Sequence, residues 1–230
     1  MNLVMLDIDG TLIQSYEYDR EVFGQVIGEL LGCPSINADL NGYVDKTSLG
    51  VTREAIQRVT GRNPEPEEIE EVKRRVLWCF EKMHQDSPQI FCEVLGASSF
   101  LEQLRHLDGV GIAIATGCWL SEALFKLNAS GMSINGISIA SSDDSQDRKQ
   151  IMAIAAEKAK RFYHCPNFDH TVYLGDGPWD LQSSRALGYG FVGIGPRAQT
   201  LIGPEGILWH QDFSDLKAVF ASIAAAVQQG

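Results

Sequence analysis

The chain has little cysteine, and the cysteines that it has form no pattern. The five are scattered along 230 residues, and none belongs to a Cys-x-x-Cys pair. An odd number of isolated cysteines argues against both a disulfide framework and a zinc site. We therefore expect reduced thiols and a cytoplasmic protein.

Positive charge and long apolar runs are also scarce. Nineteen Lys and Arg face 30 Asp and Glu, a net charge of −11. Nucleic acids and anionic membranes both select basic surfaces, so we expect neither as a partner. No apolar stretch approaches the roughly 20 residues of a membrane helix, and the first apolar run has no basic leader, so we expect no signal peptide. An acidic protein that handles an anion needs a local cation, which a divalent metal would supply.

Four apolar residues, Leu3 to Leu6, lead directly into two carboxylates. The run has the length of a buried strand, and Asp7 and Asp9 follow it one residue apart. Side chains at i and i+2 of an extended backbone point the same way, and like charges so close repel unless a cation lies between them. Gly10 permits a sharp turn after the pair. Alone, the stretch predicts either a metal-assisted site at a strand's carboxyl end or an acidic surface turn.

Short apolar runs alternate with helical segments through most of the chain. Strands are expected at 3–6, 110–115, 137–139, 171–174, 191–194 and 207–209, and helices at 22–31, 52–60, 67–80, 101–107, 120–129, 151–162, 178–187 and 213–227. This alternation predicts an α/β fold with a doubly wound, mainly parallel, Rossmann-like sheet. Residues 16–87 carry no strong strand pattern. We expect them to form a small helical cap inserted after the first strand, with residues 1–15 and 88–230 as the α/β core.

Three of the expected strands end in polar residues, at Asp7, Thr116 and Asp176. Ligands of such sheets bind at the carboxyl ends of the strands, so these side chains converge if the strands are neighbours. Asp180 follows in the first turn of the next helix. Arg148 and Lys149 begin an earlier helix and offer a positive charge. Acids, a hydroxyl and a fixed cation are what phosphoryl transfer requires, with one carboxylate attacking phosphorus.

The order of these motifs resembles the haloacid dehalogenase superfamily of phosphohydrolases. The motifs are Asp7-Ile8-Asp9-Gly10-Thr11, then Thr116-Gly117, then Arg148-Lys149, then Gly175-Asp176-Gly177-Pro178-Trp179-Asp180. The resemblance covers the whole chain. Within the superfamily, the chain is most similar to the phosphoglycolate-phosphatase-like branch, which carries a helical cap between its first two motifs.

The resemblance implies a role for each motif residue. Asp7 would be the nucleophile that forms an aspartyl-phosphate, and Asp9 the general acid and base. Mg²⁺ would be held by the Asp7 carboxylate, the Asp9 carbonyl and Asp176, with Asp180 orienting that shell. The phosphate-binding residues would be Gly10, Thr11, Thr116 and Gly117.

The sequence departs from the family pattern at two places. The family's basic residue is often a Lys followed by Pro, whereas Arg148-Lys149 is followed by Gln150. Either residue can fill the role, and we favour Lys149, with Arg148 as a further phosphate-binding candidate. In the cap, Gly42-Tyr43-Val44-Asp45 resembles a Gly-x-Thr-Asp substrate loop with Val44 in place of Thr. Asp45 is therefore either a substrate contact or a turn residue.

The expected function is magnesium-dependent hydrolysis of a small phosphorylated metabolite by a monomer or homodimer. The nearest alternative is a phosphomutase of the same fold, which would pass the phosphoryl group to a sugar hydroxyl. A phospho-accepting signalling receiver also combines acids, a Thr and a Lys on a parallel sheet, but it is about half this length. Its Lys is the last of these residues along the chain, whereas here an Asp motif comes last. A degenerate binding protein is disfavoured because none of the expected acids is missing.

Overall fold

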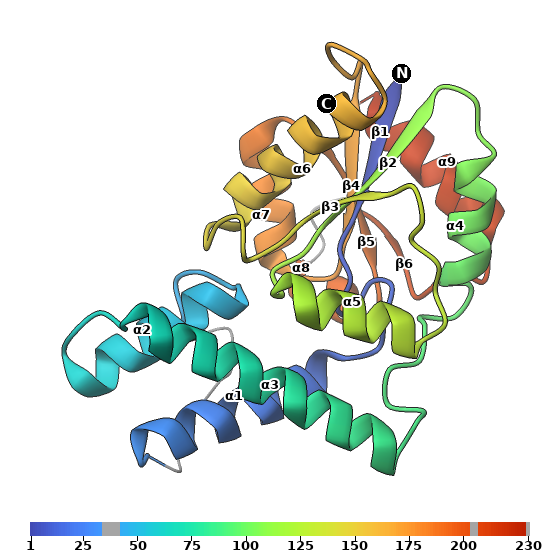
Figure 1. The fold of residues 1–230 in the computed structure, drawn as a ribbon. Coiled ribbons are helices and arrows are strands. Elements are labelled where there is room, and N and C mark those ends of the chain that lie inside the picture. The colour runs from blue at the N-terminus through green and yellow to red at the C-terminus, as the bar shows by residue number, and fades with distance from the viewer. Residues whose placement is uncertain (34–41, 203–206, 229–230) are drawn as a thin grey trace.

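The computed structural model describes residues 1–33, 42–202 and 207–228. A six-stranded, all-parallel sheet lies at the centre of these residues, in the order β3-β2-β1-β4-β5-β6 (Figure 1). The strands are β1 (Asn2–Leu6), β2 (Val110–Ala115), β3 (Ser138–Ala140), β4 (Thr171–Gly175), β5 (Gly190–Ile194) and β6 (Leu208–His210). The predicted doubly wound α/β fold is confirmed.

Helices cover both faces of the sheet, which explains why its strands read as continuous apolar runs. Val4 and Leu6 of β1 belong to a core that includes side chains of α4, α5 and α9. Leu3 and Met5 point to the opposite face and pack among side chains of α6, α7 and α8. These helices are α4 (Ala97–Arg105), α5 (Leu120–Ala129), α6 (Arg148–Phe162), α7 (Pro178–Leu187), α8 (Pro196–Ile202) and α9 (Leu216–Val227).

The sheet register aligns the carboxyl ends of three neighbouring strands. Leu6 of β1 lies beside Ile114 of β2 and Leu174 of β4. The amide of Asp7 donates to the carbonyl of Leu174 over 3.0 Å. The residues that follow β1, β2 and β4 therefore meet at one edge, where the strand order changes direction.

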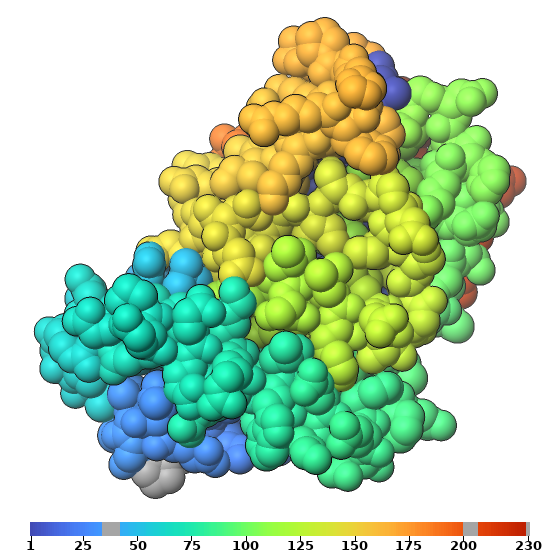
Figure 2. Space-filling model, in the orientation of Figure 1, coloured from blue at the N-terminus to red at the C-terminus, as the bar shows by residue number. Residues whose placement is uncertain are grey.

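Three further helices, α1 (Tyr16–Leu31), α2 (Ser48–Thr60) and α3 (Pro66–Asp86), pack against one another beyond this edge. In Figure 2 they form the lower part of the molecule, in blue to teal-green. They fall within the segment predicted to be the cap, part of which (34–41) lies outside the described residues. The division into cap and core stays a prediction.

Local signals set most helix ends, with some differences from the sequence prediction. Gly32 and Gly61 close α1 and α2 in the left-handed conformation that glycine adopts without strain. Helix α2 begins four residues before the predicted start because the Thr47 hydroxyl accepts from the Gly50 amide. Helix α8 was not predicted. Among the described residues, we find no helix with the length and apolarity to cross a membrane.

Candidate active site

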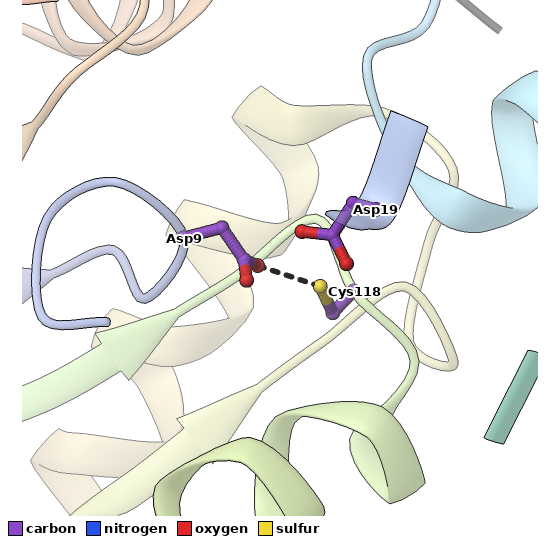
Figure 3. A group of neighbouring side chains, drawn as sticks. All are labelled: Asp9, Asp19 and Cys118. Carbon is purple, nitrogen blue, oxygen red and sulfur yellow. Dashed lines mark hydrogen bonds between the residues drawn. The ribbon is translucent and has the colours of Figure 1, made fainter. Parts of the chain in front are cut away.

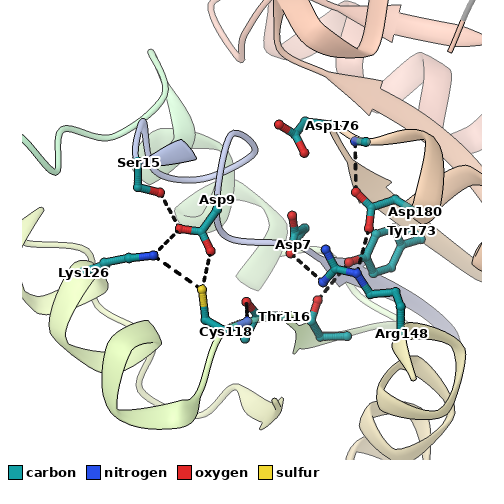
Figure 4. Close-up of polar contacts among 12 residues, drawn as sticks. Asp7, Asp9, Ser15, Thr116, Cys118, Lys126, Arg148, Tyr173, Asp176 and Asp180 are labelled. Atoms are coloured by element: carbon teal, nitrogen blue, oxygen red, sulfur yellow. Dashed lines mark hydrogen bonds and ion pairs between the residues drawn. The ribbon is translucent and has the colours of Figure 1, made fainter. Parts of the chain in front are cut away.

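Asp7 and Asp9 leave the end of β1 and contact different cations (Figure 4). Asp7 is buried and accepts from Nη1 of Arg148 at 3.1 Å. Burial raises the pKa of the Asp7 carboxyl well above its usual range, although Arg148 opposes the shift. Asp9 accepts from Nζ of Lys126 at 2.8 Å and from the Ser15 hydroxyl. Burial would raise the pKa of Asp9, but the Lys126 charge and the hydrogen bonds outweigh it and lower the pKa to about 2.

Asp176 and Asp180 reach the same edge from β4 and the start of α7. The second carboxylate oxygen of Asp180 accepts from the Gly177 amide at 3.0 Å, and its first lies 3.2 Å from Nε of Arg148. Asp176 is paired with Arg197 through one oxygen. Burial raises the pKa of Asp176 to about 7, with Arg197 opposing the shift.

Gly10 and Thr11 follow the acids in the sequence but do not line the cavity that Asp7, Asp9 and Asp176 help to form. A Cβ on Gly10 would lie 1.9 Å from Oδ2 of Asp176, and the residue has a φ of 83°. Only glycine therefore lets the loop after β1 pass so close to the carboxylate. Thr11 is fully buried. Their predicted phosphate contacts stay predictions.

Of the two consecutive basic residues, the structure brings Arg148 and not Lys149 to the acids. Asp147 caps α6, and the Arg148 side chain is buried between Asp7 and Asp180. Lys149 is exposed, because consecutive helical residues point about 100° apart. The geometry favours Arg148 over Lys149, and the role of the basic residue stays a prediction.

Thr116 and Gly117 follow β2 as expected, but only Gly117 lines the cavity. Thr116 is fully buried, and its hydroxyl accepts from the Cys118 amide at 3.1 Å. In Figure 4 it lies close to Asp7 and Arg148. Cys118 also lines the cavity, and burial raises the pKa of its thiol well above its usual range.

The loop before α2 closes over this edge, with a different residue facing inward than predicted. The Ser48 amide donates to the Gly117 carbonyl at 2.7 Å, and the Thr47 hydroxyl donates to the Gln146 carbonyl at 2.8 Å. Lys46 lines the cavity. Asp45 instead accepts from the Gln146 side chain at 3.0 Å and faces a separate surface pocket. Asp45 is not among the residues that line the cavity, and its predicted role as a substrate contact stays a prediction.

Among the described residues, two groups of side chains offer possible metal ligands, and within each group the ligand atoms lie within 4.8 Å of one another. The first acid cluster consists of Asp7, Asp176 and Asp180, whose carboxylates are the hard oxygen donors that Mg²⁺ prefers. Oδ1 of Asp176 is buried and has no hydrogen-bond partner among the described residues, which leaves it available to an ion. The first acid cluster therefore fits a divalent metal.

The second cluster consists of Asp9, Asp19 and Cys118 (Figure 3). Asp19 comes from the first turn of α1, and the Cys118 thiol donates to Asp9 over 2.7 Å. Nζ of Lys126 contacts all three side chains. Neither Asp19 nor Lys126 was predicted from the sequence as a site residue. The available signal was a lysine between apolar residues, Phe125 and Leu127, of the helix at 120–129.

The cavity above the acids has aromatic as well as charged walls. Tyr16 and Trp179 line it, and the guanidinium of Arg197 lies 3.5 Å from the ring centroid of Tyr16 and 4.9 Å from that of Trp179. Arg20, Lys46, Arg148 and Arg197 all line the cavity. Four cationic side chains around a group of carboxylates suit an anionic ligand.

Among the comparisons with known proteins, only the comparison with solved structures finds matches to this chain. No protein-family model matches the chain, and no curated protein matches it. A hydrolase from Pseudomonas syringae aligns over 97% of this chain and 99% of its own, with 21% identity and a TM-score of 0.74. A candidate β-phosphoglucomutase from Bacteroides vulgatus covers 100% and 91%, with 18% identity and a TM-score of 0.68.

A HAD hydrolase of family IA, variant 3, from Entamoeba histolytica covers 99% of this chain and 100% of its own, at 16% identity and a TM-score of 0.69. Predicted or candidate phosphoglycolate phosphatases are matched as well. All these identities lie below the level at which similarity establishes more than the fold. The chain has the fold of the haloacid dehalogenase-like hydrolases, as its motifs indicated.

Proposed function

We propose that this protein is a magnesium-dependent phosphatase that hydrolyses a small phosphate monoester through an aspartyl-phosphate on Asp7. The observation that carries the proposal is the convergence of Asp7, Asp176 and Asp180 at the strand ends, with Arg148 contacting Asp7. The matched phosphatase and phosphomutase structures support it at the level of the fold. The ligand would be a phosphorylated metabolite of the cytoplasm.

In the first step, an oxygen of the Asp7 carboxylate attacks phosphorus, and the bond from phosphorus to the leaving oxygen breaks. Arg148 contacts Asp7 and Asp180 and keeps the nucleophile in place. Asp9 gives its proton to the leaving oxygen. Because Lys126 favours ionised Asp9, this step requires the negative charge of the incoming phosphate, which raises the pKa of a neighbouring carboxyl.

In the second step, water attacks the phosphorus of the aspartyl-phosphate, and the bond to the Asp7 oxygen breaks. Asp9 takes the proton from the water. Mg²⁺ bound by Asp7, Asp176 and the Asp9 carbonyl, with Asp180 behind them, would neutralise phosphate oxygens in both steps. Because Arg197 is paired with one oxygen of Asp176, the ion would bind the other oxygen, or the ion pair with Arg197 would have to break.

The loop that contains Lys46, Thr47 and Ser48 would act as part of the cap. Its hydrogen bonds to Gly117 and Gln146 hold it beside the cavity, where it would limit the access of bulk water. The size and charge of the leaving group would be selected by the residues of this loop together with Arg20 of α1.

The experiment is a phosphate-release screen over sugar phosphates, nucleotides, phosphoglycolate and 4-nitrophenyl phosphate, with Mg²⁺ present and the Asp7→Asn variant as the inactive control. Release by the wild type and none by the variant is the expected result. Equal release by both would remove Asp7 from the mechanism. The matched candidate β-phosphoglucomutase makes a mutase the second candidate, and formation of a sugar-phosphate isomer without net phosphate release would favour it.

A further inference from the structure

Lys126 is a fully buried lysine that the proposed chemistry leaves without a role. It lies on α5 of the sheet region, and its side chain has no exposed surface. Its ammonium contacts Asp9, Asp19 and Cys118, the last at 3.4 Å. It also lies 4.8 Å from the ring centroid of Phe80. A lysine has three donor hydrogens, and three polar partners therefore hold its position.

The partners of Lys126 come from separate parts of the fold. Asp9 belongs to the loop after β1, whereas Asp19 lies in α1 and Phe80 in α3. The Lys126 side chain therefore extends from α5, beside the sheet, to the group formed by α1, α2 and α3. Its contacts connect Asp9 to these helices. Figure 4 shows its ammonium aimed at Asp9 from the side opposite Asp7.

Both oxygens of Asp9 are engaged on that side. Oδ1 accepts from Lys126 and from the Ser15 hydroxyl, and Oδ2 accepts from the Cys118 thiol. These contacts fix the rotation of a carboxylate that still lines the cavity. Burying a lysine among carboxylates carries a large desolvation cost, so such a group is a poor source of stability and is better explained by positioning.

An ion in the second cluster is the competing explanation, since Asp9, Asp19 and Cys118 are close enough to share one. The Lys126 ammonium already touches each of them and supplies a positive charge. The site therefore has its cation in the chain itself.

We propose that Lys126 is a positioning residue that holds the Asp9 carboxylate in the orientation required for proton transfer to the leaving group, and that Asp19 anchors Lys126 to α1. The inference rests on the proposed phosphatase function. It assigns Lys126 a role in the chemical step and none in substrate binding.

The test compares phenyl phosphate with 4-nitrophenyl phosphate, which have similar shapes but leaving groups of different basicity. Proton transfer matters more for the more basic phenolate. For Lys126→Met we expect the rate of leaving-group release in a single turnover, which reports the first step alone, to fall by about 10²-fold for phenyl phosphate and by only about tenfold for 4-nitrophenyl phosphate, because a general acid contributes about 10²–10⁴-fold. KM should stay within about twofold of the wild type, since binding groups are retained.

Lys158→Met is the matched control, because it removes a lysine paired with Asp144 at 2.8 Å on the far side of the sheet region. It should leave both rates unchanged. Lys126→Arg keeps the charge on a longer arm and should show a smaller, equally selective loss. That variant carries the test if Lys126→Met fails to fold.

Equal losses on the two substrates, a gain in rate, or a change confined to KM would overturn the inference while leaving the phosphatase function intact. A wild type that releases phosphate from neither substrate under the conditions of the screen would instead overturn the proposed function, and the inference with it. Selective loss with the expected size supports both.

Discussion

The two clusters of possible metal ligands are alike in spacing and differ in where their cations lie. In the first acid cluster, Arg148 contacts Asp7 and Asp180, and Arg197 is paired with one oxygen of Asp176. The other oxygen of Asp176 has no hydrogen-bond partner among the described residues. In the second cluster, the ammonium of Lys126 touches every member. Judged by distance alone, both clusters could hold a metal ion.

The difference shows that the position of the cation decides what an acid cluster can do. A guanidinium at the edge leaves carboxylate oxygens for a further ion, and its planar fork can contact two acids at once. An ammonium that contacts every member of a cluster supplies the positive charge that an ion would bring and holds the side chains in place. One cluster is thus suited to binding an ion and a phosphate, and the other to positioning Asp9.

The largest difference between the two clusters is expected when one acid in each of them is neutralised. Asp176→Asn should lower turnover by about 10³-fold, because a group that stabilises charge in the transition state is lost. Asp19→Asn should lower it by less than about tenfold, since the asparagine still offers Lys126 an oxygen. Steady-state rates on 4-nitrophenyl phosphate provide the measurement, and equal losses would contradict the distinction.

Metal binding separates the clusters without any reliance on activity. Excess Mg²⁺ should stabilise the wild type and Asp19→Asn by about 2.7 kcal/mol at one hundred times Kd, which is a rise of several degrees in Tm. Asp176→Asn should show no such rise. A normal thermal shift in Asp176→Asn would move the metal away from the first acid cluster.

The next largest effect is expected within one pair of neighbouring basic residues. Arg148→Met should reduce kcat by about 10²-fold, because Asp7 loses its buried partner. Lys149→Met should stay within about twofold, since exposed substitutions have little effect. Circular dichroism of both variants controls for folding. A larger loss in Lys149→Met would restore the assignment made from the sequence.

The last prediction concerns stability and Glu122, a third carboxyl near Lys126. It accepts from the Ser48 hydroxyl and the Trp119 amide, and burial raises its pKa from 4.5 to about 7. A carboxyl whose pKa is higher in the folded than in the unfolded state does not lower the free energy of unfolding below the pKa of the unfolded state. Above the pKa of the folded state it lowers the free energy of unfolding by the full amount. The free energy of unfolding should therefore fall between pH 5 and 8 by up to about 3 kcal/mol more in the wild type than in Glu122→Gln.

Urea unfolding of both proteins at the two pH values measures this difference. The glutamine oxygen can accept from the same two donors, so the variant is expected to fold. Parallel pH profiles would show that Glu122 is ionised at little cost, with its charge compensated by Lys126.

The sequence predicted those parts of the site that follow directly from strands. The apolar run Leu3 to Leu6 had to be buried on both faces, and its end placed Asp7 at the sheet edge. The same reasoning placed Asp176 after β4. Parallel neighbours then follow from topology, since consecutive crossover units align the carboxyl ends of their strands.

The parts that the sequence did not predict depend on the direction in which a helix or loop residue points. Arg148 and Lys149 differ by a single helical step, so the exact start of α6 decides which one is buried. Asp45 and Lys46 are neighbours in a loop whose shape depends on contacts with Gly117 and Gln146. Lys126 needs the packing of α5 against two distant helices before its partners can be known.

The most direct test of the account is to locate the covalent phosphoryl group. The wild type, mixed with Mg²⁺ and 4-nitrophenyl phosphate and quenched in acid during turnover, should yield a peptide phosphorylated at Asp7 on mass spectrometry. The Asp7→Asn variant should yield none. A phosphoryl group found on another residue, or turnover by the wild type with no phosphorylated peptide at any quench time, would contradict the assignment of Asp7 as the nucleophile.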